Sequence, residues 1–190
     1  MVPRIKKNID DLNTYRQSAI RNSLNPITET DIRKLHLKNI STSRNFVIGV
    51  STKPELGTNY TGWRFKTKLS EFEAMYYERW ILFEKNVYFL DRIYFHLYEI
   101  DSLNLESKEF VLLHCDSALP DDADHAIYKQ SPHLHFYCAP QPIPHSHIAL
   151  NNYDLEKVFH SLDNLDEAFK RSIQMIDDQI LSLIKVGHKS

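Results

Sequence analysis

Apolar and polar positions in the N-terminal third of the chain follow first a helical period and then a strand period. Over residues 10–24 the apolar side chains recur at helical spacing, and residues 28–37 have the length and the threonine cap of a second short helix. Residues 45–51 are almost uniformly apolar, and in residues 60–68 aromatic residues alternate with basic ones. We therefore predict that these last two segments are strands.

The central part of the chain opens with a helix-start signal and continues as a series of strand patterns. The Ser-Glu-Phe-Glu sequence at its start has the form of a capping box, which predicts a helix from residue 70 to about residue 80. Residues 92–100 and 108–117 alternate with period two around a polar turn, so a β-hairpin is expected. Residues 131–139 have a third strand pattern, and residues 145–150 form a short edge strand beyond a proline-rich loop.

The C-terminal part of the chain is predicted to be helical again. A first helix is expected over residues 153–162, and a capping box at Asn164 opens a long amphipathic helix. Because the chain has no linker or internal repeat, residues 1–190 are expected to form a single α+β domain. Its sheet should be mostly antiparallel, with the long helix packed on the apolar face. Its parts are a helical N-terminal part (1–44), a sheet region with the histidine-rich segment (45–150) and the C-terminal helices (151–190).

Strand side chains alternate between the two faces of a sheet, so the three central strands can be sorted residue by residue. One face is uniformly apolar and carries Ile93, Phe95, Leu97, Val111, Leu113, Cys115, Leu134, Phe136 and Cys138. The other face changes from apolar to polar and carries Arg92, Tyr94, His96, Tyr98, Phe110, Leu112, His114, Asp116, His133, His135 and Tyr137. A solvated face usually carries Lys, Glu, Thr and Ser instead, so any functional site is expected on this second face.

Histidine is concentrated on and near the second face. Six of the ten histidines lie within 34 residues, namely His114, His125, His133, His135, His145 and His147. Two His-x-His pairs, 133–135 and 145–147, stand out, and on a strand both members of a pair project to one side about 7 Å apart. Either both pairs converge on one metal ion or phosphate, or one pair lies in the face and the other packs against a loop.

Composition and charge narrow the range of partners. With 190 residues, of which 42% are hydrophobic, the chain can bury a sizeable core. The net charge of −2 gives no global reason to expect nucleic acid, and no apolar run is long enough to span a membrane. No secretory signal is expected. Cys115 and Cys138 form no CxxC motif and are expected to be buried free thiols in a reducing, cytoplasmic compartment.

The first hypothesis for the histidine-rich segment is acid–base catalysis on a phosphodiester, as in a ribonuclease. One histidine would remove a proton from the nucleophile and another would protonate the leaving oxygen. The candidate catalytic residues are His133, His135, His114, His145 and His147. The candidates for stabilising phosphoryl charge are Lys129, Arg92, Arg64 and Lys66. The surfaces on which bases of single-stranded nucleic acid could stack are Tyr94, Tyr98 and Tyr137.

The second hypothesis is a metal site that holds a divalent transition-metal ion such as Zn, Mn or Ni. Imidazole and carboxylate groups are suitable ligands. The candidate ligands are His133, His135, His145, His147 and Asp116. The metal-free chemistry, with no cofactor, is slightly preferred, because the chain has no carboxylate at a fixed ligand spacing.

The third hypothesis is a non-enzymatic subunit or adaptor whose aromatic face binds a protein partner. The concentration of histidine argues against a pure adaptor, because an interface does not require it. The sequence Pro-His-Leu-His-Phe at residues 132–136 resembles strands of small bacterial proteins, some from toxin–antitoxin or defence loci. This resemblance covers five residues, assigns the chain to no family, and favours a nuclease. The four glycines leave no room for a P-loop or a dinucleotide-binding fingerprint.

Overall fold

The computed structural model describes residues 5–29, 35–53, 57–101, 103, 106–116, 133–136, 146–149, 158 and 160–187 of the chain. The elements, in chain order, are β1 (Lys6–Asn8), α1 (Ile9–Asn13), α2 (Tyr15–Leu24), η1 (Asn25–Ile27), β2 (His36–Ser41), β3 (Asn45–Ser51), η3 (Tyr60–Gly62), β4 (Phe65–Lys66), β5 (Phe72–Glu84), β6 (Val87–Ile100), β7 (Ser107–Asp116), β8 (His133–Phe136), β9 (Ser146–Ala149), α4 (Leu162–Met175), the π-helix η5 (Ile176–Leu181) and α5 (Ser182–Gly187). The predicted α+β class is confirmed, and the sheet dominates it.

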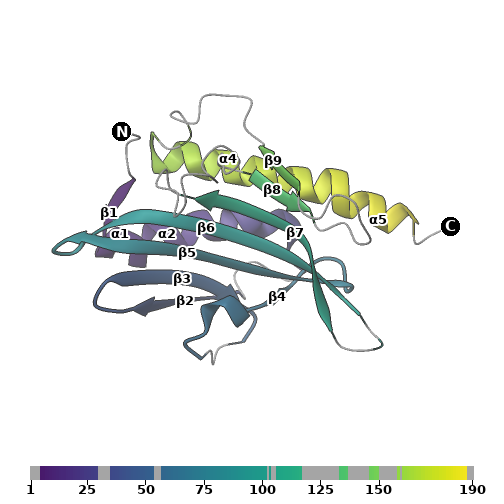
Figure 1. Ribbon diagram of the computed structural model, residues 1–190, viewed down its shortest axis with the longest axis horizontal. Helices are drawn as coiled ribbons and strands as arrows, with labels where there is room; N and C mark the ends of the chain where they lie inside the picture. Colours follow the sequence, from purple (N-terminus) through teal and green to yellow (C-terminus); the bar gives the residue numbers. More distant parts are fainter. Residues whose placement is uncertain are drawn as a thin grey trace.

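The strands form one antiparallel sheet, in the order β2-β3-β5-β6-β7-β8-β9, with β1 added to β6 and β4 added to β5 (Figure 1). Its two longest strands, β5 and β6, form a hairpin that turns at Lys85 and Asn86. Asn86 has a φ of 61°, a left-handed conformation that asparagine adopts more readily than most residues. The predicted hairpin of residues 92–100 and 108–117 is also present, as the pairing of β6 with β7.

The helix predicted from residue 70 to about residue 80 is wrong, because this segment belongs to the strand β5. Phe72 and Tyr76 are buried in the main core, whereas Met75 and Tyr77 are buried in a second apolar cluster. A strand that is buried on both faces has no polar stripe to reveal its period. The strand pairs with β3 on one side and β6 on the other, and these ladders outweigh the local capping signal.

Three other predicted elements differ from the structure. The predicted helix 28–37 is wrong where it is described, because its last residues begin β2, which pairs along its whole length with β3. The predicted strand 60–68 begins instead with the 3-10 turn η3, and only the two residues of β4 and the isolated bridge at Thr67 are extended pairings. The N-terminal helix is interrupted at Thr14, which separates α1 from α2.

The long C-terminal helix begins slightly earlier than its capping box predicts. The N-cap is Ser161, whose side-chain oxygen accepts a hydrogen bond from the backbone N–H of Asn164 at 3.1 Å. Residues 153–157, where another helix is predicted, lie outside the described residues, as do the ends of the predicted strands 131–139 and 145–150 around β8 and β9. Within the described part of the chain, no helix combines the length and apolarity needed to cross a lipid bilayer.

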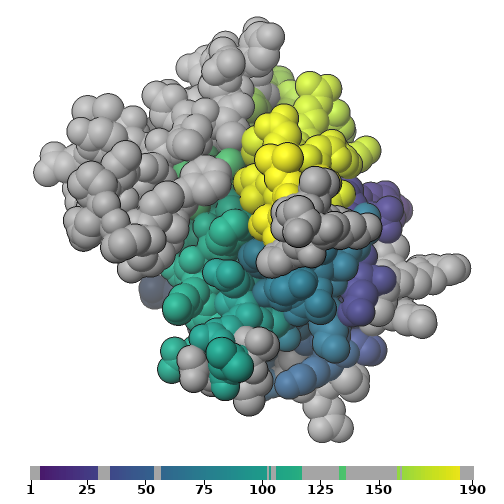
Figure 2. All heavy atoms as spheres, turned by 90° about the vertical axis from the view of Figure 1, so that its right-hand side faces the viewer, coloured from purple at the N-terminus to yellow at the C-terminus, as the bar shows by residue number. Residues whose placement is uncertain are grey.

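The apolar face that the sequence predicts for the central strands is buried in the main core. Its described side chains, each 0–2% exposed, are Ile93, Phe95, Leu97, Val111, Leu113, Cys115 and Leu134. The same cluster contains the helix residues Leu12, Ile20, Leu24, Leu165, Phe169 and Ile173. The ring of Phe169 packs edge-on against Tyr76 of β5. Figure 2 shows the C-terminal helices (yellow) lying directly against the strands (teal and blue).

One residue of the predicted polar face belongs to the core instead. Phe110 packs against the main core, and its ring centroid lies 5.1 Å from that of Phe72. The pairing of β6 with β7 shifts register between Leu97 and Tyr98. A bulge of this kind adds a residue to one strand and re-aims its side chains, so the simple alternation fails at this position.

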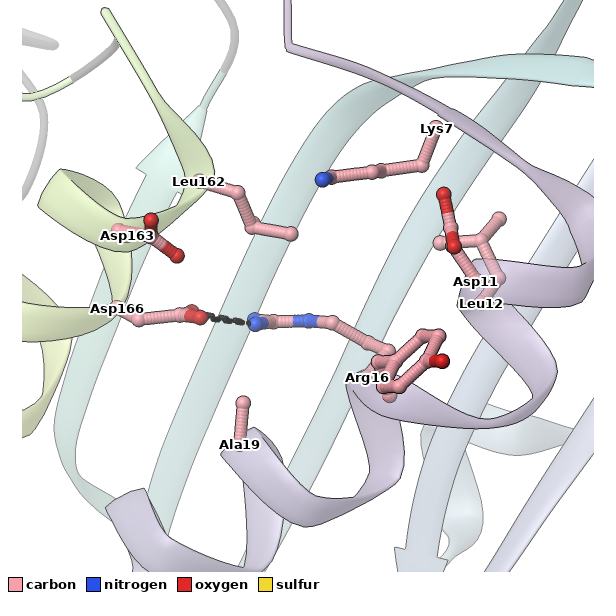
Figure 3. Close-up of a pocket in the computed structure, with 9 residues that line it drawn as sticks. Lys7, Asp11, Leu12, Arg16, Ala19, Leu162, Asp163 and Asp166 are labelled. Carbon is pink, nitrogen blue, oxygen red and sulfur yellow. Dashed lines mark hydrogen bonds and ion pairs between the residues drawn. The ribbon is translucent and has the colours of Figure 1, made fainter.

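A buried ionic network joins the N-terminal helices, the sheet and the C-terminal helix. Arg16 of α2 is 4% exposed, and its Nε and Nη2 atoms lie 2.7 and 2.6 Å from the carboxylate of Glu78 on β5. The other end of the same guanidinium donates to Asp166 of α4 (Figure 3). Burial opposes the charge on Arg16, but the interactions with Glu78, Tyr76 and Asp166 together outweigh it and raise the pKa of the guanidinium above its ordinary value. A pocket of about 180 Å³ lies over this network, and Lys7 is among the residues that line it.

Candidate functional site

The polar face of the central sheet is built by cross-strand neighbours on β6, β7 and β8. His114 of β7 lies opposite Tyr94 of β6 on one side and opposite His133 of β8 on the other. His135 is two residues further along β8, so it projects to the same face as His133. Directly opposed residues on neighbouring strands share a face. The register therefore brings three histidines, from segments far apart in the sequence, to one place.

His114, His133 and His135, here called the histidine triad, form a compact group. One nitrogen from each ring lies within 4.8 Å of the other two. The ring centroids are 4.3 Å apart for His114 and His135, and 4.7 Å apart for His133 and His135. His133 is 0% exposed and His135 is 6% exposed, while His114 is partly buried. The triad is thus a buried group with one partly accessible member.

A run of three alternate residues on β6, namely Tyr94, His96 and Tyr98, lies beside the triad and is here called the tyrosine–histidine ladder. The ring of Tyr94 stacks on His114 at a centroid distance of 3.8 Å, with the two planes only 6° apart. The ring nitrogens of His96 lie 2.8 Å from Nε2 of His114 and 3.0 Å from the hydroxyl oxygen of Tyr98. Two members of the ladder therefore touch the triad directly.

The electrostatics of the ladder keep its groups uncharged at neutral pH. Burial, assisted by the nearby Arg64, lowers the pKa of His96 to about 4. Burial also raises the pKa of Tyr94, and the carboxylate of Asp116 raises it further. The pKa of Tyr98 is raised by burial as well. At pH 7 His96 is accordingly a neutral imidazole, and both phenols keep their protons.

A carboxylate lies at the other end of the triad. The hydroxyl group of Tyr94 donates a 2.6 Å hydrogen bond to Oδ1 of Asp116. The second oxygen of this carboxylate, Oδ2, is 4.0 Å from Nε2 of His133. The guanidinium of Arg92 is hydrogen-bonded to Asp91 at 2.7 Å and lies over the ring of Tyr94. Asp116 is therefore held in a defined position beside His133.

Comparison of the chain with protein-family models, with curated proteins and with solved structures gave no match.

The other residues that the sequence singles out lie beside the triad, near the ladder, away from both, or outside the described residues. The backbone of His147 in β9 is in register with His135. Arg64 lies over the ring of Tyr98 at 4.0 Å, whereas Lys66 is exposed on β4, opposite Glu73. The remaining candidates, which lie outside the described residues, are His125, Lys129, Tyr137 and His145.

His96 belongs to the site but is not among the candidate residues predicted from the sequence. Its position on the polar face follows from the period-two alternation of β6, but only the register of β6 with β7 brings it against His114. Tyr77 is a second omission, because the segment that contains it is predicted to be a helix. Its ring lies 5.4 Å from that of Tyr94 and extends the aromatic surface beside the ladder.

The triad has the donor set of a transition-metal site. Three imidazole nitrogens can hold Zn, Ni or a similar ion at about 2.0–2.1 Å, which for tetrahedral geometry places the nitrogens about 3.3 Å from one another. The observed upper limit of 4.8 Å is somewhat wider. Rotations of the imidazole rings about their side-chain bonds are the movements that would close this difference.

Proposed function

We propose that this protein is a metal-dependent hydrolase whose histidine triad binds one divalent transition-metal ion, zinc in the first instance. The observation that carries the proposal is the approach of three imidazole nitrogens, from His114, His133 and His135, to within 4.8 Å of one another. Imidazole is the commonest protein ligand for such ions. Three histidines that leave one coordination position open are the ligand set of a catalytic rather than a structural zinc site.

Burial favours the metal site over metal-free acid–base catalysis. Acid–base catalysis requires one imidazole to carry a proton, and His133 and His135 are 0% and 6% exposed. A protonated imidazole buried in this way loses its hydration energy. Imidazoles that bind a metal ion stay neutral and avoid this cost, because the positive charge is on the ion.

Guanidinium groups near the ladder favour an anionic substrate. Arg92 lies over the ring of Tyr94, and Arg64 lies over the ring of Tyr98. Guanidinium binds phosphate oxygens through paired N–H groups. A zinc ion held by His114, His133 and His135 would supply Lewis acidity and would activate water as a nucleophile. We therefore propose a phosphodiester, such as single-stranded RNA, as the substrate class.

The first experiment measures the metal content of the purified protein by mass spectrometry and compares it with triad variants. We expect about one equivalent of zinc, manganese or nickel, and less than a tenth of that in His114→Ala and His135→Ala. His36→Ala is the matched control, because His36 is exposed on β2, at the opposite end of the sheet order. Circular dichroism checks that each variant is folded. Metal retained in both triad variants would contradict the proposed site.

The second experiment tests the reaction. Hydrolysis of single-stranded RNA and of bis(p-nitrophenyl) phosphate should be lost on treatment with a chelator and restored by the ion found in the protein. Activity that survives complete removal of metal would reinstate metal-free acid–base catalysis. Bound metal without hydrolysis of either substrate would leave the metal site standing and refute the phosphodiester as substrate.

A further inference from the structure

One ring nitrogen of His114 contacts a row of polar groups on β6. Its Nε2 atom lies 2.8 Å from Nε2 of His96, and Nδ1 of His96 lies 3.0 Å from the hydroxyl oxygen of Tyr98. These three groups form a chain that runs from the histidine triad along β6. A metal-binding histidine almost always donates its other ring N–H to a partner, which orients the ring and increases its basicity.

Two directions of hydrogen bonding fit these distances. In the first, the Tyr98 hydroxyl donates to His96, His96 donates to Nε2 of His114, and the proton of His114 stays on Nδ1. In the second, Nε2–H of His114 donates to Nε2 of His96, and Nδ1–H of His96 donates to the oxygen of Tyr98. Only the second direction gives Nδ1 of His114 the lone pair that a metal requires.

We propose that His96 is the positioning residue of the metal centre, where it accepts the Nε2–H of His114 and so directs Nδ1 of His114 toward the ion. Tyr98 holds the ring of His96 in turn. This inference rests on the proposed metal site and adds an outer residue to it. His96 and His114 are close in space although they belong to different strands, β6 and β7. The stacked Tyr94 ring, 3.8 Å from His114, limits rotation of the same imidazole.

The test compares zinc affinity, measured by competition with a chelator of known affinity, across variants of the outer residues. His96→Phe keeps a flat ring but removes the acceptor, and we expect roughly 10- to 100-fold weaker binding. His96→Gln, whose amide oxygen can accept the same N–H, should lose less affinity than His96→Phe. Tyr98→Phe should show a smaller loss in the same direction. His36→Phe, at the exposed control position, should bind zinc as the wild type does.

X-ray absorption of the zinc-loaded proteins separates a positioning role from direct coordination. The number of imidazole ligands should be the same in the wild type and in His96→Phe. Loss of one imidazole from the zinc shell of His96→Phe would make His96 a ligand and overturn the inference. Unchanged affinity in His96→Phe, with binding lost in His114→Ala, would overturn the inference alone. A wild-type protein that binds no zinc, manganese or nickel would overturn the proposed function as well.

Discussion

Replacement of Arg16 by methionine should strongly destabilise the fold. Arg16 is 4% exposed and its partner Glu78 is 0% exposed. The carboxylate of Glu78 also accepts hydrogen bonds from the hydroxyl group of Tyr76 and, at 2.9 Å, from the indole N–H of Trp80. Methionine keeps most of the apolar stem of arginine but leaves this carboxylate in the core without its cation.

The expected cost follows from the burial of the pair. Removal of one partner of a buried ion pair typically costs about 3–5 kcal/mol, because the remaining charge is uncompensated. Domains of ordinary stability unfold with only about 5–15 kcal/mol. For a chain of this size, such a loss lowers the melting temperature by roughly 6–20 °C. The Arg16→Met variant should therefore melt well below the wild type.

A second substitution shows whether the unpaired carboxylate of Glu78 causes the loss of stability in Arg16→Met. In Arg16→Met/Glu78→Gln the amide needs no cation, and it can still accept from Trp80 and donate to the oxygen of Tyr76. The double variant should recover about 0.5–3 kcal/mol relative to Arg16→Met, which is the usual range of coupling between partners in contact. Asp166 reaches the protein surface in part, with 21% of its side chain exposed, so water can replace Arg16 there.

The assay is equilibrium unfolding in urea, followed by tryptophan fluorescence and far-ultraviolet circular dichroism. The control is Arg171→Met, because the Arg171–Glu167 pair is on the surface of α4, with side chains 78% and 54% exposed. Exposed pairs of this kind contribute little to stability. A cost of less than about 1 kcal/mol for Arg16→Met, or no recovery in the double variant, would refute the reasoning.

Two further predictions concern the core. Gly49→Ala should destabilise the protein and shift its tryptophan emission, because a Cβ at Gly49 would lie 2.2 Å from Cε3 of the buried Trp63. Gly57→Ala is the control, because a Cβ at Gly57 would have no heavy atom within 4 Å. Cys115 should resist iodoacetamide at pH 8 and react fully in guanidinium chloride, since burial raises the pKa of its thiol. Rapid alkylation of Cys115 in the native protein, detected by peptide mass spectrometry, would contradict its placement in the core.

Period-two alternation predicted most of the side-chain directions on β6, β7 and β8. It predicted the β6–β7 hairpin and the buried face that contains Ile93, Phe95 and Leu113. The same alternation places His114, His133 and His135 on one face. The rule worked because strand geometry sends every second side chain to the same side, whatever the partner strand is.

Local signals failed where pairing with distant strands decided the conformation. The capping-box pattern at residues 70–73 predicts a helix, yet the segment is a central strand with neighbours on both sides. The same limit applies to Phe110, whose face depends on a bulge in the β6–β7 pairing. Neither the neighbours nor the bulge is recorded in the local sequence pattern.

The sequence by itself determined the period of β6, β7 and β8, and with it the separation of an apolar face from a face rich in histidine and tyrosine. The tertiary structure alone decided which residues meet. Arg16 finds Glu78 across 62 residues and Asp166 across 150 residues, and His96 meets His114 only through the strand register. The physical reason is that alternation is a property of the local backbone, whereas register and helix docking are set by the packing of the whole core.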